Sequence, residues 1–246
     1  MKQENWYDVD TARGGDFSLS NAFPILMRKV FVWMTLALAI TGITAYGVAS
    51  SPALVGMIFS SKVMFWGLII AEFGLVMAIS GAINRLSLAT ATLLFILYSV
   101  VNGATLSVIF LAYSTTVIAK TFFITAGTFG AMALVGYTTK TDLTSIGKLL
   151  FMALIGIIIA SVVNIFVGSS GLDLIISYVG VLVFVGLTAY DTQKIKEMCR
   201  MAPDAGESMQ KLALLGSLSL YLDFVNLFLY LLELRVMICF LALSLD

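Results

Sequence analysis

Long apolar runs, separated by short polar stretches, dominate the chain. Seven of these runs approach the roughly 20 residues that a helix needs to cross a bilayer. A membrane barrel would instead alternate apolar and polar residues at every second position, which these runs do not do. The pattern therefore predicts an all-α membrane protein, a bundle of seven transmembrane helices. We expect the spans over 27–49, 63–83, 89–112, 119–137, 149–168, 173–193 and 212–234.

The polar stretches define the domain organisation. We expect residues 1–26 to form a polar cytoplasmic tail, loosely ordered over its first 20 residues, and residues 27–246 to form a single seven-helix transmembrane domain. The tail lacks the basic-then-apolar order of a secretory signal. The longest internal polar stretch is DTQKIKEMCRMAPDAGESMQK at 191–211, which we expect to be an exposed loop between the last two spans.

Composition supports this class and excludes several functions. Hydrophobic residues make up 60% of the chain and charged residues only 11%, against about 25% charged residues in soluble domains. The chain has no histidine, so histidine triads, imidazole metal sites and histidine-based pH sensing are excluded. The two cysteines have no metal or redox spacing, and no phosphate-binding loop of the G-x-x-x-x-G-K-[ST] type occurs. We therefore expect no cofactor and no ATP-driven pumping, and the zero net charge gives no reason to expect a nucleic-acid partner.

Basic residues are distributed unequally between the two sides of the predicted bundle. Of the 14 lysines and arginines, 11 fall on the side of the N-terminal tail and three on the other. Because lysine and arginine concentrate in cytoplasmic loops, we expect a cytoplasmic N-terminus and an external C-terminus. The polar tail and the lack of targeting signals are typical of a protein of the bacterial cytoplasmic membrane.

Three carboxylates lie inside the apolar runs or at their ends, where an ion is costly. Glu72 lies near the middle of the second predicted span, Asp223 lies near the middle of the seventh, and Asp191 ends the sixth. A charge at the bilayer centre costs roughly 2.5–3.5 kcal/mol on insertion scales, so such a residue usually faces the bundle interior and serves a function. The structural alternative is a protonated carboxyl that hydrogen-bonds to a neighbouring helix.

Asp191 and Asp223 belong to consecutive antiparallel spans, and their depths become similar if the sixth span continues as a helix beyond its apolar run. Two carboxyls in contact away from water cannot both ionise cheaply, so they tend to share one proton. Such a pair would form a latch between two helices that responds to pH. Asn226 shares a helix face with Asp223 and could donate a hydrogen bond. Arg85 is the candidate cationic partner, although its position at the end of the second span also suits an interfacial anchor.

Two segments also resemble a known family. GLTAYDTQKIKEM at 186–198 and SLYLDFVNLFLYLL at 219–232 are similar to the two signature segments of the Bax-inhibitor family, the transmembrane Bax inhibitor motif proteins. The resemblance implies a seven-helix bundle with the last helix at its centre, acting as a pH-sensitive calcium leak channel. It also implies that Asp191 and Asp223 are the family's aspartate pair, and that Glu72 and Arg85 belong to the pore or the latch.

The leading prediction is a cation leak channel, with calcium as the ion that the resemblance implies. Carboxylates are hard oxygen ligands suited to calcium, so Asp191, Asp223 and Glu72 are candidate ligands during its passage. The expected partners are calcium ions, protons and the lipid bilayer, and no enzymatic activity is expected.

Three alternatives stay open. A proton-coupled cation exchanger could use the same carboxylates. A membrane-embedded interaction protein could modulate proteases or cell-death and stress factors through the predicted 192–211 loop. An intramembrane aspartyl protease would fit Tyr190-Asp191, but the glycines that should precede its second aspartate are replaced by Tyr221-Leu222.

Overall fold

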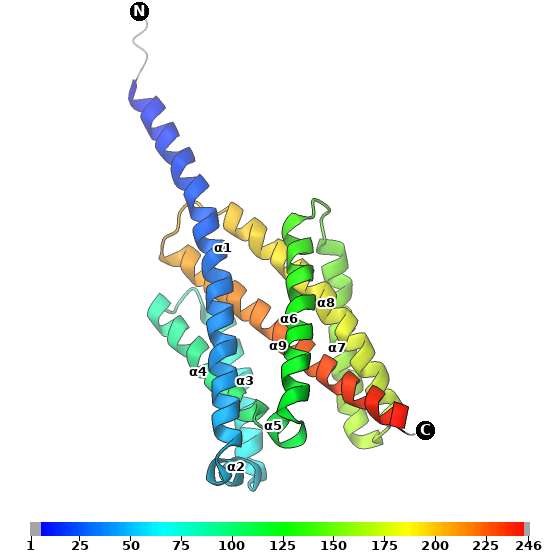
Figure 1. The fold of residues 1–246 in the computed structure, drawn as a ribbon. Helices are drawn as coiled ribbons and strands as arrows, with labels where there is room; N and C mark the ends of the chain where they lie inside the picture. Colours follow the sequence, from blue (N-terminus) through cyan, green and yellow to red (C-terminus); the bar gives the residue numbers. More distant parts are fainter. Residues whose placement is uncertain (1–5, 244–246) are drawn as a thin grey trace, which may run out of the picture.

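The structure, a computed structural model, describes the backbone of residues 6–243 and the side chains of residues 22–237 (Figure 1). Seven helical stretches within this range are long and apolar enough to cross a membrane. The prediction of an all-α bundle of seven transmembrane helices is therefore confirmed. The helices are α1 (Trp6–Ala49), α2 (Pro52–Phe59), α3 (Lys62–Ala82), α4 (Leu88–Leu106), α5 (Val108–Ala112), α6 (Thr115–Thr138), α7 (Thr144–Val167), α8 (Ser170–Arg200) and α9 (Glu207–Leu243).

The spans begin and end where the sequence supplies capping residues. Ser61, Ser87, Ser114 and Ser169 each accept a hydrogen bond from the backbone N–H three residues later, which satisfies one of the free donors at a helix start. Gly168 ends α7 with a φ of 65°, a left-handed conformation that glycine adopts without steric cost. Short polar stretches therefore suffice to separate the spans.

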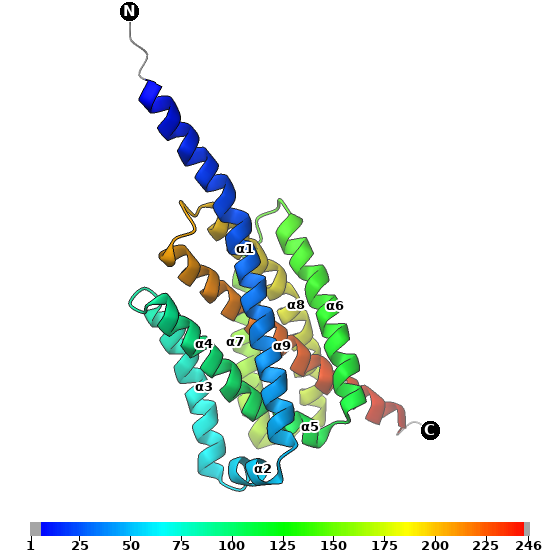
Figure 2. The ribbon, with the colours of Figure 1, turned by 60° about the vertical axis from the view of Figure 1, so that its left-hand side comes forward.

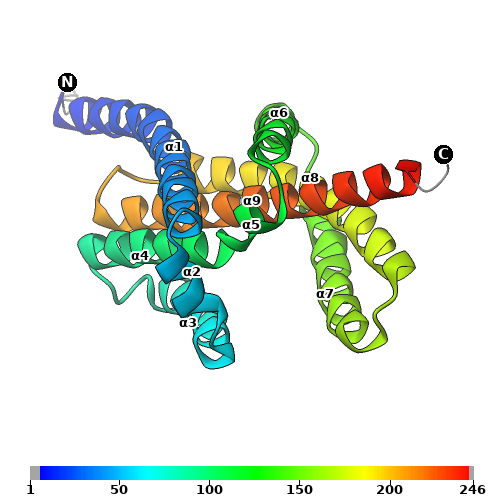
Figure 3. The same ribbon diagram turned by 60° about the horizontal axis from the view of Figure 1, so that its bottom comes forward.

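Helix α9 lies at the centre of the bundle. It packs against α8, α1, α6 and α4, and Figure 3 shows it running across the middle of the molecule between α6 and α4. In the membrane-spanning window, 61% of the α9 residues are buried, against 6% for the peripheral helix α3. The last helix is central, as expected.

Two helix pairs approach closely at a glycine. A Cβ atom at Gly136 of α6 would overlap the backbone carbonyl of Ala189 in α8, and a Cβ at Gly103 of α4 would lie 2.6 Å from the carbonyl oxygen of Thr41 in α1. Small residues let membrane helices come this close. The two contacts fix α8 against α6 and α4 against α1.

The polar segments at the helix ends differ from the expectations. Helix α1 begins at Trp6, so the tail is helical from that residue rather than loosely ordered, and residues 1–5 lie outside the described part. The prediction of a loop over 191–211 is wrong, because α8 continues to Arg200 and α9 begins at Glu207. Both changes have one physical reason: adding a residue to an existing helix gains a hydrogen bond without a new nucleation cost. The loop between α8 and α9 is therefore only 201–206.

Candidate ion and proton site

The helix ends and turns that together carry most of the basic residues meet at one end of the bundle. Figure 2 shows the N-terminal part of α1 and the α3–α4, α6–α7 and α8–α9 turns at the same end. Hydrogen bonds tie them together: the Lys29 Nζ donates to the Gln210 Oε1 at 2.6 Å, and the Lys211 Nζ donates to the Leu86 carbonyl oxygen at 3.0 Å. We call this region, made of residues 84–87, 139–143 and 201–206 with the adjoining helix ends, the basic end.

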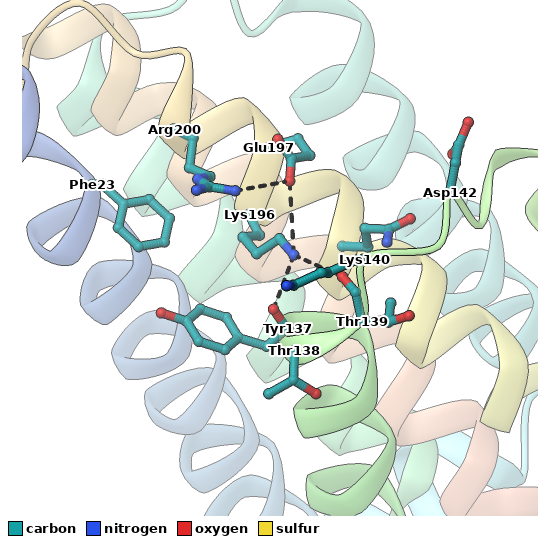
Figure 4. Close-up of a pocket in the computed structure, with 10 residues that line it drawn as sticks. Phe23, Tyr137, Thr138, Thr139, Lys140, Asp142, Lys196, Glu197 and Arg200 are labelled. Atoms are coloured by element: carbon teal, nitrogen blue, oxygen red, sulfur yellow. Dashed lines mark hydrogen bonds and ion pairs between the residues drawn. The ribbon is translucent and has the colours of Figure 1, made fainter.

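A cavity of about 560 Å³ opens at the basic end between α1, α6 and α8 (Figure 4). Lys196 lies in its wall with 8% of its surface exposed. The Lys196 Nζ donates to the carbonyl oxygens of Tyr137 at 2.9 Å and Thr139 at 3.4 Å, and it lies 3.7 Å from the Glu197 Oε1. These partners neutralise the buried ammonium and join α8 to the end of α6. The cavity is a polar recess on the α8 surface. The first α8 residue that lines it is Gln193, two residues after Asp191 in the sequence.

The carboxylate of Asp142, in the α6–α7 turn, lies at the rim of this cavity. The Thr144 backbone N–H donates to the Asp142 Oδ1 at 2.9 Å. Hydrogen bonds from the Thr144 side chain and backbone lower the pKa of Asp142, because they stabilise the ionised form. The Asp142 side chain therefore carries a negative charge at neutral pH.

Asp223 is the most deeply buried carboxylate among the described residues. It lies on α9 with 5% of its surface exposed, and its Oδ2 is buried without a hydrogen-bond partner. Asp191, on α8, lies near enough to Asp223 for the charges of the two carboxyls to interact. The positive charge of Lys194 interacts in turn with the Asp191 carboxyl. Asp191 itself is half-buried. No hydrogen bond joins the two carboxyls within the described residues, so the structure does not show them as a bonded pair.

Glu72 has a different environment. Its Oε2 accepts a hydrogen bond from the Asn102 Nδ2 of α4 at 3.3 Å, and its Oε1 is buried without a partner. Asn102 is also bonded to the hydroxyl of Tyr221 in α9 at 2.8 Å. The structure therefore connects Glu72 to the central helix through two polar side chains.

Among the described residues, the other two predicted site residues make no hydrogen bond or ion pair with the aspartates. Arg85 is exposed in the α3–α4 turn and makes no ion pair with another described residue, a position that suits an interfacial anchor. The Asn226 Nδ2 donates to the Leu222 carbonyl oxygen at 2.8 Å, within its own helix. The candidate calcium ligands are likewise divided, because Glu72 faces α4 while the aspartates lie between α8 and α9. Among the residues searched, no group of three or more carboxylate, thiol or imidazole side chains could hold a metal ion.

Sequence reasoning missed the partners of Glu72. Asn102 and Thr41 are polar residues in the middle of apolar runs, with 7% and 5% of their surfaces exposed, and Tyr221 is fully buried. The signal that could have found Asn102 is the one that found Glu72, a strongly polar side chain in the centre of a predicted span. Which helix each one faces depends on helix rotation, which the printed sequence does not give.

Fold and buried carboxylates together define a multi-pass membrane protein with seven transmembrane helices around a polar centre. A model for the family described as "Inhibitor of apoptosis-promoting Bax1" matches residues 24–240. The chain therefore belongs to the Bax-inhibitor family, as its two signature-like segments predicted.

Relatives of similar length support this membership. The Inner membrane protein YbhL of Escherichia coli K12 is 50% identical over 208 residues, which cover 84% of this chain and 89% of the relative. A protein of Borreliella burgdorferi is 52% identical over 207 residues, covering 84% of this chain and 89% of the relative. The protein RP147 of Rickettsia prowazekii is 45% identical, covering 84% and 87% respectively.

Proposed function

We propose that this protein is a pH-sensitive calcium leak channel of a bacterial cytoplasmic membrane, gated by Asp191 and Asp223. The observation that supports the proposal is the Asp223 carboxyl, which is buried in the central helix, lacks a partner for one oxygen and has Asp191 as a charged neighbour. The orientation proposed with it places the basic end in the cytoplasm, where lysine and arginine concentrate. The proposal assigns no catalytic step to the protein.

The gating step follows from the electrostatics of two close carboxyls. With one proton between them, the pair carries a single negative charge, and a short charge-assisted hydrogen bond can hold α8 to α9. With no proton, two negative charges repel each other in a medium of low dielectric constant. Since α8 and α9 are adjacent and antiparallel, the repulsion would separate them beside the polar recess of the basic end. A calcium ion entering there would neutralise the charges, which suits a hard cation with oxygen ligands.

Calcium flux tests this function directly. The purified protein is reconstituted into liposomes with an internal calcium dye, and flux is recorded across a pH series. The proposal expects a flux that changes with pH in the wild type and a pH-independent flux in Asp191→Asn and Asp223→Asn. Asp204→Asn, which alters a carboxylate in the exposed 201–206 loop, is the matched control and should keep the wild-type response. A wild-type flux that ignores pH, or unchanged responses in both aspartate variants, would count against the gate.

A proton-coupled cation exchanger would use the same aspartates. It can be distinguished from a leak channel by the gradient that drives calcium flux. A leak channel passes calcium down its own gradient when the pH is equal on both sides. An exchanger needs a proton gradient or creates one. Calcium flux that stops when an ionophore collapses the pH difference would favour exchange over leak.

A further inference from the structure

A continuous chain of hydrogen bonds links Glu72 to three other helices. From Asn102, which bonds to Glu72, the chain runs to the Tyr221 hydroxyl at 2.8 Å and then to the Thr41 Oγ1 at 2.7 Å. It ends where the Thr41 Oγ1 lies 3.0 Å from the Ser99 carbonyl oxygen. Ser99 and Tyr221 have no exposed surface. The chain thus crosses from α3 through α4 and α9 to α1, and all of its members from Asn102 onward are buried.

Counting protons gives this chain two possible directions of donation. When Glu72 is ionised it can only accept, so the Asn102 amide donates to it, Tyr221 donates to Asn102, and Thr41 donates to Tyr221. The single hydroxyl proton of Thr41 is then used, and its contact with Ser99 holds no hydrogen bond. Every other link in the chain is satisfied.

The opposite direction requires a proton on Glu72. The neutral carboxyl donates to the Asn102 oxygen after the amide turns over, which changes its shape little because its oxygen and nitrogen are similar in size. Asn102 then donates to Tyr221, Tyr221 donates to Thr41, and Thr41 donates to the Ser99 carbonyl. In this state all links are made, including the one between α1 and α4.

We propose that Glu72 is a second proton-binding site, separate from the aspartates, and that its proton sets the direction of the chain through Asn102 and Tyr221 to Thr41. Binding the proton makes the hydrogen bond between Thr41 of α1 and Ser99 of α4, and releasing the proton breaks it. The proton at the peripheral helix is thus communicated to α1 and to the central helix α9. This site does not depend on which ion, if any, the protein conducts.

Among the described side chains, Asn102 has a hydrogen bond to Glu72 with a defined distance, and the other groups around Glu72 are few. Helix α3 packs against α2 and α4, and α2 carries no titratable residue. On α4 the titratable group near Glu72 is Tyr98, and from α9 it is Tyr221. Thr105, also on α4, is close enough for its hydroxyl to act on the Glu72 carboxyl, and the same hydroxyl donates to the Val101 carbonyl oxygen at 3.3 Å. No charged residue among the described side chains competes for Glu72.

The close approach at Gly103 holds the far end of the chain together. A Cβ at Gly103 would lie 2.6 Å from the Thr41 carbonyl oxygen and 2.8 Å from the Thr44 Cβ, so the absence of a side chain lets α1 reach α4 beside Asn102. The separation of Thr41 from Ser99 is thereby fixed by backbone packing. A change in donor direction can make or break their bond without moving either helix.

Infrared spectroscopy of the protonated carboxyl tests the proposal without any flux measurement. The Glu72 band is assigned in the reconstituted wild type by its loss in Glu72→Gln, and its pH midpoint is then measured. The key variant is Thr41→Val, because Thr41 bonds to Tyr221 and Ser99 and can affect Glu72 only through the chain. We expect it to move the midpoint of the band by about half to one pH unit, the equivalent of one hydrogen bond.

Two controls and a second variant make the result decisive. Thr35→Val, on the exposed side of α1, should leave the midpoint at its wild-type value. Tyr221→Phe should move it, whereas Tyr98→Phe, whose ring packs on Tyr221 and whose hydroxyl has no bond to the chain, should move it less. The proposal is overturned if the band never titrates, if Thr41→Val and Tyr221→Phe leave the midpoint unchanged, or if the controls shift it equally.

Discussion

Helices α9 and α3 each carry one carboxylate in the middle of an apolar sequence, and the two carboxylates have different surroundings. Asp223 lies in the central helix, with 5% of its surface exposed and another carboxylate, Asp191, as its charged neighbour. Glu72 lies on the peripheral helix, is half-buried, and has the amide of Asn102 as its partner. The same residue chemistry is thus placed near a second carboxyl in one region and at the end of a neutral hydrogen-bond chain in the other.

The difference teaches what each region can do with a proton. A like charge makes the protonation of one group depend on the other, so the aspartates of the proposed gate would exert force between two helices. A neutral chain exerts no such force, but it can pass a change of direction from donor to donor. The four predictions that follow test this contrast, from the largest expected effect to the smallest.

The close contact between Gly136 of α6 and Ala189 of α8, beside Asp191, should not tolerate an added methyl group. In Gly136→Ala, the new methyl group meets the Ala189 carbonyl, two residues before Asp191, and neither partner has a side-chain rotation that relieves the overlap. We expect a loss of about 3 kcal/mol in the free energy of unfolding in detergent micelles. Gly130→Ala, on the same helix with no atom near the added methyl, should be nearly neutral. Equal stability of the two variants would contradict the close approach of α6 and α8.

Removing Asn102, the hydrogen-bond partner of Glu72, should leave the Glu72 carboxyl without that partner, as one oxygen of Asp223 already is. In Asn102→Leu, both Glu72 and Tyr221 lose a hydrogen bond within the bundle. We expect a loss of about 2 kcal/mol of unfolding free energy at neutral pH, because buried polar groups are left unsatisfied. Adding Glu72→Leu should recover part of this loss, since no carboxyl then needs a partner. If the double variant is less stable than the single one, Asn102 does not act through Glu72.

Breaking the chain at its centre should have a smaller effect. Tyr221→Phe removes one hydroxyl that contacts Asn102 and Thr41 and keeps the ring, which packs edge-on against Phe95 and Tyr98. We expect a loss of about 1 kcal/mol in thermal or denaturant unfolding. Tyr178→Phe, on the exposed surface of α8, is the reference variant. A change no greater than that of the reference would mean that the Tyr221 hydroxyl does not stabilise the fold.

Asp142 provides a carboxylate in water with which both regions can be compared. Its pKa is lowered by the hydrogen bonds from Thr144, so its contribution to stability is present above the ordinary aspartate range, near pH 4. That contribution should fade as the pH falls through its folded pKa. Asp142→Asn should therefore lower the melting temperature slightly at neutral pH and not at strongly acidic pH. If the difference in melting temperature between the wild type and Asp142→Asn grows as the pH falls, the pKa of Asp142 is not lowered in the folded protein.

Hydropathy was sufficient to predict the spans, because each of the seven apolar runs is long enough to impose a helix on its own. It could not predict that α8 continues to Arg200 or that α1 begins at Trp6, since polar residues extend a helix without leaving an apolar signal. Hydropathy did not single out α9 as the central helix either. That prediction came from the resemblance of 219–232 to a known family.

The residues of the candidate site also fall into two groups, those that the sequence could identify and those that it could not. Asp191, Asp223 and Glu72 could be selected from the sequence because a carboxylate in an apolar run is conspicuous by itself. Their partners could not, since Asn102 reaches Glu72 only through the rotation of α4 about its axis. Arg85 was a candidate from its position along the chain, and the structure places it in an exposed turn.

The coupling between Asp191 and Asp223 is the central claim, and titration of the Asp223 carboxyl by infrared spectroscopy measures it most directly. The pH midpoint of the Asp223 band, assigned by its loss in Asp223→Asn, is compared between the wild type and Asp191→Asn. Two carboxyls that share a proton predict that the substitution moves this midpoint by about one pH unit or more. An identical midpoint in both proteins would show that each aspartate titrates alone, and the proposed gate would then have no basis.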